Sequence, residues 1–135
     1  MTVISFNFTK ISAERNEGIK GKLNISNNVS IKDVKSFDLK LGKNKEKALK
    51  LEFLFEAKYD PNIGNISLGG EIVYMGTADK VKNIESEWKK NKKLPNDVVE
   101  EVMSNILSKC NIEALIMSRE INLPAPIPLP KVKSK

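Results

Sequence analysis

Residues 49–76 read LKLEFLFEAKYDPNIGNISLGGEIVYMG, and this stretch decides the fold. Over residues 49–59 an apolar side chain stands at every second position, and the same alternation returns over residues 66–74. A period of two is typical of a β-strand with one buried face. Between the two runs, Pro61 fixes φ and Gly64 permits a positive φ, as a tight turn requires. We therefore predict a β-hairpin.

The residues before this hairpin show the same alternation in three shorter rows. The rows are Ile4, Phe6 and Phe8, then Leu23, Ile25, Val29 and Ile31, then Phe37, Leu39 and Leu41. The connections between the rows are too short to contain a crossover helix, so neighbouring strands should run antiparallel. We predict an antiparallel sheet of four or five strands in meander order, in which each strand pairs with the next one along the chain.

After the hairpin the apolar spacing changes to that of helices. Thr77 or Asp79 is suited to cap a first helix, whose buried side carries Val81, Ile84 and Trp88. This short helix should end in the lysine-rich segment that follows. The change of period predicts an α+β fold in which helices follow a sheet.

A second, longer helix is predicted from about residue 96 to residue 121. Pro95 suits its first turn, because proline lacks the N–H that the start of a helix leaves unpaired. The apolar stripe, with spacings of three and four residues, consists of Val99, Met103, Ile106, Cys110, Ala114, Met117 and Ile121. The predicted order is thus an antiparallel sheet, a short helix and a long C-terminal helix.

The far half of the long helix also carries apolar residues on a second side. Ile112, Leu115 and Ile116 cannot all join the stripe, because each residue advances by about 100° around the helix. Monomers seldom expose an apolar patch of this kind. We expect these three residues to meet a second copy in a homo-oligomer, a dimer or tetramer; the alternative is that the C-terminal tail folds back over them.

The C-terminal tail has proline at every second position from residue 124 to residue 130. A helix or a central strand cannot accommodate this pattern, so an extended polyproline-like strap is expected. We predict one α+β domain over residues 1–122 and a proline-rich extended tail over residues 123–135.

Composition argues against enzymatic chemistry. The 135 residues include one cysteine and no histidine, which excludes Ser-His-Asp and Cys-His catalysis, Cys/His zinc sites and internal disulfides. No nucleotide-binding glycine motif occurs. Cys110 belongs to the apolar stripe, and Glu52 and Glu56 would stand about 13 Å apart on a strand, too far to cooperate. We predict no catalytic residue, no metal ligand and no cofactor.

The sequence also gives expectations for location. No apolar run approaches the roughly 18 residues of a membrane span, and the first ten residues lack the pattern of a signal peptide. We expect a cytoplasmic protein without membrane insertion.

The formal net charge is +6, and lysines supply most of it. Two groups of lysines stand out in the sequence: Lys43, Lys45 and Lys47, and then Lys89, Lys90, Lys92 and Lys93. Such groups are either solvated loops or contacts to the phosphates of RNA. A basic accessory protein that binds RNA or the ribosome is therefore one hypothesis.

The order of the elements resembles that of the SecB-like export chaperones. The similar part covers about residues 50–130, through LEFLFEAKYD, NISLGGEIVYMG, the Leu94-Pro95 helix entry and the closing INLPAP. The resemblance implies an α+β fold, assembly as a dimer of dimers, and grooves that hold unfolded polypeptide without ATP. The basic charge of this chain departs from the acidic bacterial members, which puts docking to the export ATPase in doubt.

Two function hypotheses follow from the sequence. The first is a non-enzymatic, SecB-like holdase that binds non-native polypeptides through apolar grooves and sheet edges, with Tyr74, Met75, Trp88 and Leu94 as groove walls. The second is the RNA- or ribosome-associated protein described above, with the two lysine groups as its contacts. Salt distinguishes them, because phosphate binding weakens steeply with salt whereas apolar capture does not.

Overall fold

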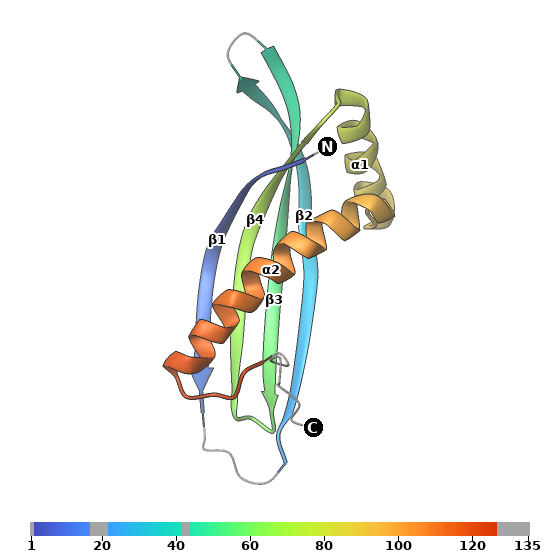
Figure 1. Ribbon diagram of the computed structural model, residues 1–135. Coiled ribbons are helices and arrows are strands. Elements are labelled where there is room, and N and C mark those ends of the chain that lie inside the picture. Colours follow the sequence, from blue (N-terminus) through green and yellow to red (C-terminus); the bar gives the residue numbers. More distant parts are fainter. Residues whose placement is uncertain (1, 17–21, 42–43, 127–135) are drawn as a thin grey trace, which may run out of the picture.

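The computed structural model describes residues 2–16, 22–41 and 44–126. These residues form four strands, β1 (Thr2–Arg15), β2 (Asn24–Leu41), β3 (Asn44–Asp60) and β4 (Gly64–Gly76), and then two helices, α1 (Ala78–Asn91) and α2 (Asn96–Glu120) (Figure 1). The strands make one antiparallel sheet. The predicted α+β architecture, a sheet followed by a short and then a long helix, is confirmed.

The order of strands across the sheet is β1-β4-β3-β2, so the predicted meander is wrong for the first strand. β2, β3 and β4 pair in succession, but β1 pairs with β4 and not with β2. Alternation shows that a segment is a strand and does not specify its partner. The eight residues 16–23 reach about 26 Å when extended, more than the about 14 Å across three strand spacings. β1 and β2 are therefore the two edges of the sheet.

β2 is a single strand of 18 residues where the sequence suggested two apolar rows. A β-bulge between Ile31 and Asp33 inserts one residue. Because side chains alternate between faces, the insertion moves the helix-facing positions from Val29 and Ile31 to Val34. The row at residues 37–41 belongs to β2 and is not a fifth strand, and its Phe37 and Leu39 lie on the other face of the sheet.

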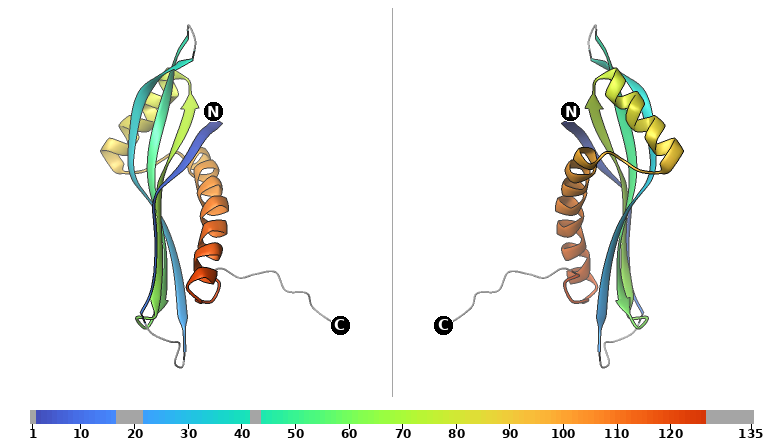
Figure 2. Two further views of the ribbon diagram at one scale, coloured as in Figure 1. Left: turned by 90° about the vertical axis from the view of Figure 1, so that its left-hand side faces the viewer. Right: turned by 90° about the vertical axis from the view of Figure 1, so that its right-hand side faces the viewer.

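One face of the sheet carries the hydrophobic core. Alternate residues of β3 and β4 are buried there, and they join buried residues of both helices in one cluster. The sheet is strongly twisted, so that its two ends face different directions (Figure 2). α1 packs beside the upper part of β2, and α2 crosses the front of the sheet toward β1 (Figure 1). The predicted hairpin at residues 49–76 is the centre of this core.

The helices begin and end close to the predicted residues. The Thr77 hydroxyl accepts a hydrogen bond from the Lys80 N–H at 3.3 Å and caps α1, and Val81, Ile84 and Trp88 are buried. Figure 1 shows α2 as the longest helix, beginning after a short linker.

The buried stripe of α2 repeats every fourth residue: Val98, Val102, Ile106, Cys110, Ala114 and Ser118. A helix turns about 100° per residue, so a period of four drifts by about 40° per step around the axis. A helix that crosses a twisted sheet needs such a drift to stay in contact with it. Val99, Met103 and Met117, which the sequence placed in the centre of the stripe, are its half-buried flanks.

The turn between β3 and β4 uses a different residue from the one predicted. Asn62 takes the positive φ, at 49°, whereas Gly64 does not need one. Gly64 supplies space instead: a Cβ at this position would collide with the Glu14 carbonyl and stand 3.2 Å from the Leu123 side chain. β1 and the end of the chain can therefore pack closely here.

The segment after α2 lies across the lower end of the helix-covered face. Leu123 is buried, the Tyr59 hydroxyl donates to the Pro124 carbonyl at 2.5 Å, and the Asn27 Nδ2 donates to the Pro126 carbonyl at 2.8 Å. Burial raises the pKa of Tyr59 to about 12, which keeps this hydroxyl a donor at ordinary pH. These contacts hold the extended segment against β3 and β2.

Candidate functional site

A groove opens where β2 meets the junction of the two helices. Its walls come from the middle of β2, the end of α1, the linker and the first turns of α2, and its volume is about 330 Å³. The lining residues are Val29, Ser30, Ile31, Trp88, Lys92, Lys93, Leu94, Val99 and Met103. Most of these side chains are apolar, so the groove is suited to apolar groups of a ligand. We call it the β2-edge groove.

The short linker brings the two helices together at this groove. Lys92 ends α1 in the left-handed conformation, with φ at 57°, and its N–H donates to the Trp88 carbonyl at 2.8 Å. Pro95 directly precedes the first residue of α2. The chain therefore turns within a few residues, and the start of α2 lies near the end of α1 (Figure 1).

Trp88 supplies the largest side chain of the groove lining. It is 7% exposed, and the Lys92 ammonium lies 5.4 Å from the centre of its ring, a cation–π contact. The indole Nε1 is the one buried side-chain polar atom in the described ranges without a hydrogen-bond partner. An unpaired buried donor costs about 1–3 kcal/mol. Trp88 therefore contributes apolar surface and the cation–π contact to the groove, whereas its unpaired donor is buried from solvent.

Two carboxylates close the upper part of the β2 edge. Asp33 Oδ1 accepts the Val34 N–H at 2.9 Å, and Glu85 Oε2 accepts the Ser36 N–H at 2.6 Å. The hydrogen bond from Ser36 lowers the pKa of Glu85, so this carboxyl stays ionised. Val34 and Ser36 occupy helix-facing positions of β2. Their contacts show that the helix-facing residues of this strand point their N–H groups away from β3.

In the part of the chain that the structure describes, no side chain closes the lower part of the β2 edge in this way. Along a strand, every second residue points its side chain to the same face and its backbone N–H and C=O groups to the same neighbouring side. Ile25, Asn27, Val29 and Ile31, the helix-facing residues before the bulge, therefore direct their backbone groups to the open edge, where no described residue pairs with them. An open edge beside apolar pockets is the arrangement by which sheets bind extended polypeptides.

The structure brings together two of the four residues predicted as groove walls. Trp88 and Leu94 line the β2-edge groove from α1 and from the linker. The sequence analysis did not assign Val29, Ile31 and Met103 to the site. Their apolar spacing assigned them to the core. Val29 and Ile31 line the groove because β2 lies at the sheet edge, and Met103 lines it from the first turns of α2.

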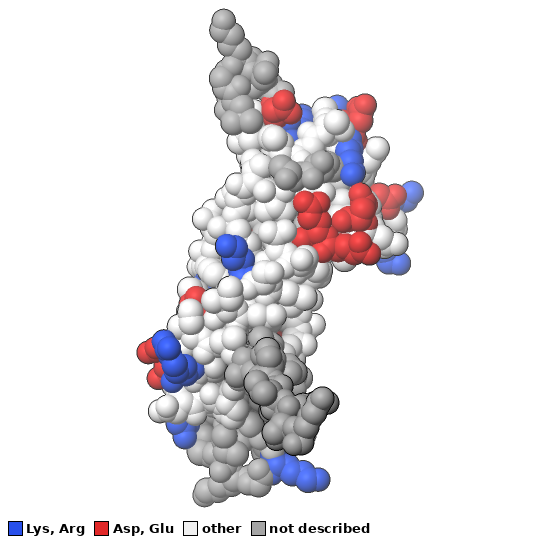
Figure 3. Space-filling view, viewed as in Figure 1, with Lys and Arg blue, Asp and Glu red and all other residues white. Residues whose placement is uncertain are grey.

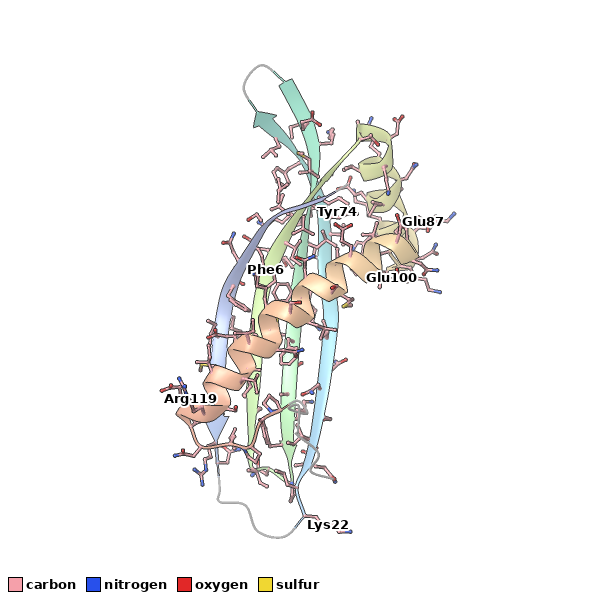
Figure 4. All side chains as sticks on the ribbon, viewed as in Figure 1. Phe6, Lys22, Tyr74, Glu87, Glu100 and Arg119 are labelled. Carbon is pink, nitrogen blue, oxygen red and sulfur yellow. The ribbon has the colours of Figure 1, made fainter. Side chains whose placement is uncertain are left out.

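Tyr74 and Met75 lie elsewhere. Tyr74 is 2% exposed in the core, and its hydroxyl donates to Glu101 Oε2 at 2.9 Å (Figure 4). Burial, and then the contact with Glu101, raise the pKa of Tyr74 to about 12. Met75 is half-buried and follows Tyr74 in β4, so its side chain lies on the opposite face of the sheet. Because β4 is a central strand, a groove on one face of the sheet cannot be lined by the side chains of both of these neighbouring residues.

The predicted interface residues of the long helix are exposed in the single chain. Ile112 is 60% and Ile116 is 41% exposed, whereas Leu115 is half-buried. The described part of the tail bonds to Tyr59 and Asn27 and leaves these two isoleucines accessible. Figure 3 shows charged side chains around the helix junction and near the end of α2, with a largely uncharged surface between them.

The lysines of the RNA hypothesis are distributed over different surroundings. Lys43 and the side chain of Lys45 lie outside the described residues, and Lys47 pairs with Asp38 at 2.8 Å. In the second group Lys89 and Lys90 are exposed in the last turn of α1, whereas Lys92 and Lys93 line the β2-edge groove. Glu87 and Glu100 lie at the same helix junction (Figure 4). The second lysine group is therefore interrupted by carboxylates.

The remaining chemistry of the described residues is sparse. No group of three or more His, Cys, Asp or Glu side chains there could hold a metal ion. Cys110 is buried, and burial raises the pKa of its thiol to about 12, so the reactive thiolate is disfavoured. No helix of the described ranges is long and apolar enough to span a membrane.

The chain has an α+β fold in which one sheet edge and the junction of two helices border an apolar groove. No family model matches the sequence, and no curated protein matches it. A solved structure of a SecB-like chaperone from Mycobacterium tuberculosis, in complex with a ChAD peptide from an antitoxin, has a similar fold, with a TM-score of 0.55. The two sequences are 7% identical, and the similarity covers 99% of this chain and 91% of that one. The chain therefore has a SecB-like fold.

Proposed function

We propose that this protein is a SecB-like chaperone, a non-enzymatic holdase that binds segments of non-native polypeptides in the cytoplasm. The observation that carries the proposal is the open edge of β2 beside an apolar groove lined by Trp88, Leu94 and Met103. The fold neighbour from Mycobacterium tuberculosis was solved with a bound peptide, which supports the same class of ligand.

Apolar burial supplies the affinity in this proposal. Each large side chain of a client that leaves water for the groove contributes about 1.5–3 kcal/mol. Because the walls are apolar and the backbone edge is independent of sequence, the site should accept many different segments. Binding should survive or strengthen as salt rises.

We further propose that the protein acts as a homo-oligomer. Ile112 and Ile116, which lie one turn apart, give the far half of α2 an exposed apolar pair on its outer side, and Leu107 is 40% exposed on another side of the same helix. Between residues 102 and 118 the charged residues are Lys109 and Glu113. A helix side with so little charge is suited to contact the same surface of a second copy.

The test of the chaperone function is suppression of aggregation of a chemically unfolded client, followed by light scattering at low and at high salt. We expect suppression at near-stoichiometric amounts and about tenfold weaker suppression by Leu94→Asp, which places a charge in the groove. Ile4→Asp is the matched control, because Ile4 is also apolar and is 42% exposed on β1 at the other sheet edge. Unchanged client scattering with the wild-type protein would contradict the proposed function.

A further inference from the structure

The β2 edge has a defined open length. Above the bulge, the Val34 and Ser36 N–H groups are occupied by Asp33 and Glu85. Below it, the edge-directed backbone groups from Ile25 to Ile31 have no partner among the described residues. These seven residues span about 20 Å at 3.3 Å per residue. The bulge and these two carboxylate contacts therefore mark the upper limit of the open part of the edge.

The groove reaches this open edge. Val29 and Ile31 turn their side chains to the helix-covered face, whereas Ser30 between them turns to the other face, and all three line the groove. Because consecutive residues of a strand point to opposite faces, a groove lined by all three of them extends around the edge of β2. A ligand in the groove is therefore within reach of both the backbone groups and the side chains of Trp88 and Leu94.

The face on which the groove lies decides the direction of an added strand. In an antiparallel pair, residues that exchange hydrogen bonds carry their side chains on the same face. In a parallel pair, the added residues that bond to β2 would turn their side chains to the face opposite to that of Val29 and Ile31. Only antiparallel addition lets one residue both bond to the β2 backbone and place its side chain in the groove.

The same corner of the sheet already holds extended chain. The segment from Leu123 to Pro126 lies across β3 and β2, and its last described carbonyl is bound by the Asn27 side chain, two residues before Val29. Extended polypeptide is thus compatible with the surface next to the groove, and the segment is bound there through the Asn27 side chain and not through the backbone of β2.

We propose, resting on the chaperone function above, that a client segment of about seven residues adds to β2 as an antiparallel strand between Ile25 and Ile31. Every second client residue bonds to β2 and carries an apolar side chain toward Trp88 and Leu94. The residues between them need neither a free N–H nor an apolar side chain. The site therefore selects client segments that have a free N–H and an apolar side chain at every second residue, rather than one particular sequence.

The experiment uses the wild-type chain and a fluorescein-labelled heptapeptide of alternating leucine and serine, LSLSLSL, with binding measured by fluorescence anisotropy. Two modified peptides carry two N-methyl groups each, one peptide on its two inner leucines and the other on the first two of its three serines. We expect N-methyl leucine to weaken binding at least tenfold, because these N–H groups face β2, and N-methyl serine to change it less than about twofold. The two peptides have matched composition and matched loss of donors.

Each other outcome overturns the inference. Equal tolerance of both modifications would show capture by side chains alone, and loss confined to N-methyl serine would show parallel addition. The unmodified heptapeptide could fail to bind while an unfolded protein still binds and its aggregation is suppressed. That result would refute the strand addition and leave the chaperone function in place. Failure of both ligands would remove the proposed function as well.

Discussion

Gly70→Ala should damage the core, whereas the adjacent Gly69→Ala should not. Gly70 lies in β4 between Phe8 of β1 and Phe53 of β3. It has no side chain, so aromatic rings from both neighbouring strands can meet above it. The ring centroids of Phe6 and Phe53 are 5.2 Å apart, and those of Phe8 and Phe53 are 6.4 Å apart. The aromatic cluster thus takes the space that a residue 70 side chain would occupy.

A Cβ at Gly70 would stand 2.7 Å and 2.9 Å from two atoms of the Phe53 ring, and it would also collide with the backbone carbonyl of Asn7. Relief needs a shift of β1 itself, which places the cost at about 3 kcal/mol, the upper end of overpacking effects. For a chain of this length that corresponds to a fall in Tm of about 10 °C. At Gly69 the nearest atom to a Cβ is Lys10 Cβ, at an ordinary 3.4 Å.

Denaturant unfolding of the two variants, followed by far-UV circular dichroism, tests this reasoning. We expect Gly69→Ala to remain within about 0.5 kcal/mol of the wild type, because an added Cβ at this buried position would meet its neighbours only at ordinary van der Waals distances. If Gly70→Ala unfolds at the same midpoint as Gly69→Ala, the close packing of Phe53 and Asn7 around residue 70 is refuted.

Three further predictions concern the outer side of α2, the β2 edge and the core thiol. Leu115→Asp should lower the mass measured by light scattering while the far-UV spectrum stays folded; a wild-type protein that is monomeric at high micromolar concentration would contradict the oligomer. Glu85→Gln should cost about 1 kcal/mol of unfolding free energy at neutral pH, a modest figure because Glu85 is partly exposed. In the folded state the pKa of Glu85 is lowered by the hydrogen bond from Ser36, and Lys89 and Lys47 act in the same direction. The difference in unfolding free energy between wild type and variant should therefore be largest above the carboxyl pKa of the unfolded chain. It should shrink as pH falls through the pKa of the folded protein. A difference that stays constant from neutral to acid pH would exclude the role of the ionised carboxylate. Cys110 should react with a thiol reagent only after unfolding, because its thiol is buried and its pKa is raised to about 12. Fast reaction of the folded protein would show that the sheet does not cover this side of α2.

Local patterns in the sequence were sufficient to predict most individual elements. The alternation over residues 49–76 identified the central hairpin, and Thr77 and Pro95 marked the starts of the two helices. These features depend on residues close together in the chain. Period, capping and proline geometry act within a few residues, so the sequence displays them directly.

The arrangement of those elements depends on contacts that no local pattern encodes. β1 pairs with β4 because the connection at residues 16–23 is long enough to cross the sheet, and nothing in β1 itself specifies that partner. The bulge after Ile31 reverses the faces of β2 without a glycine to mark it. The fourfold period of the α2 stripe follows from the twist of the sheet, which is a property of the assembled strands.

The residues of the candidate site divide in the same way, into those that a local pattern predicts and those that depend on the assembled sheet. Trp88 and Leu94 flank the helix junction in the sequence, and that position was enough to propose them as groove walls. Val29 and Ile31 belong to the site because β2 is an edge strand, and Tyr74 does not because β4 is central. Two contacts limit the open edge: Asp33 accepts the N–H of the next residue in β2, and Glu85 reaches β2 from α1. Neither contact can be recognised in the sequence.

Residue-resolved hydrogen exchange of the wild-type protein, with and without a permanently unfolded, reduced and carboxymethylated client, tests the central claim most directly. The edge-directed amides of Ile25, Val29 and Ile31 should exchange fast in the free protein and become protected when the client binds. The amides of Val34 and Ser36, already bonded to Asp33 and Glu85, should change little and serve as the internal control. Client binding that leaves the Val29 and Ile31 amides unprotected would contradict capture at the β2 edge.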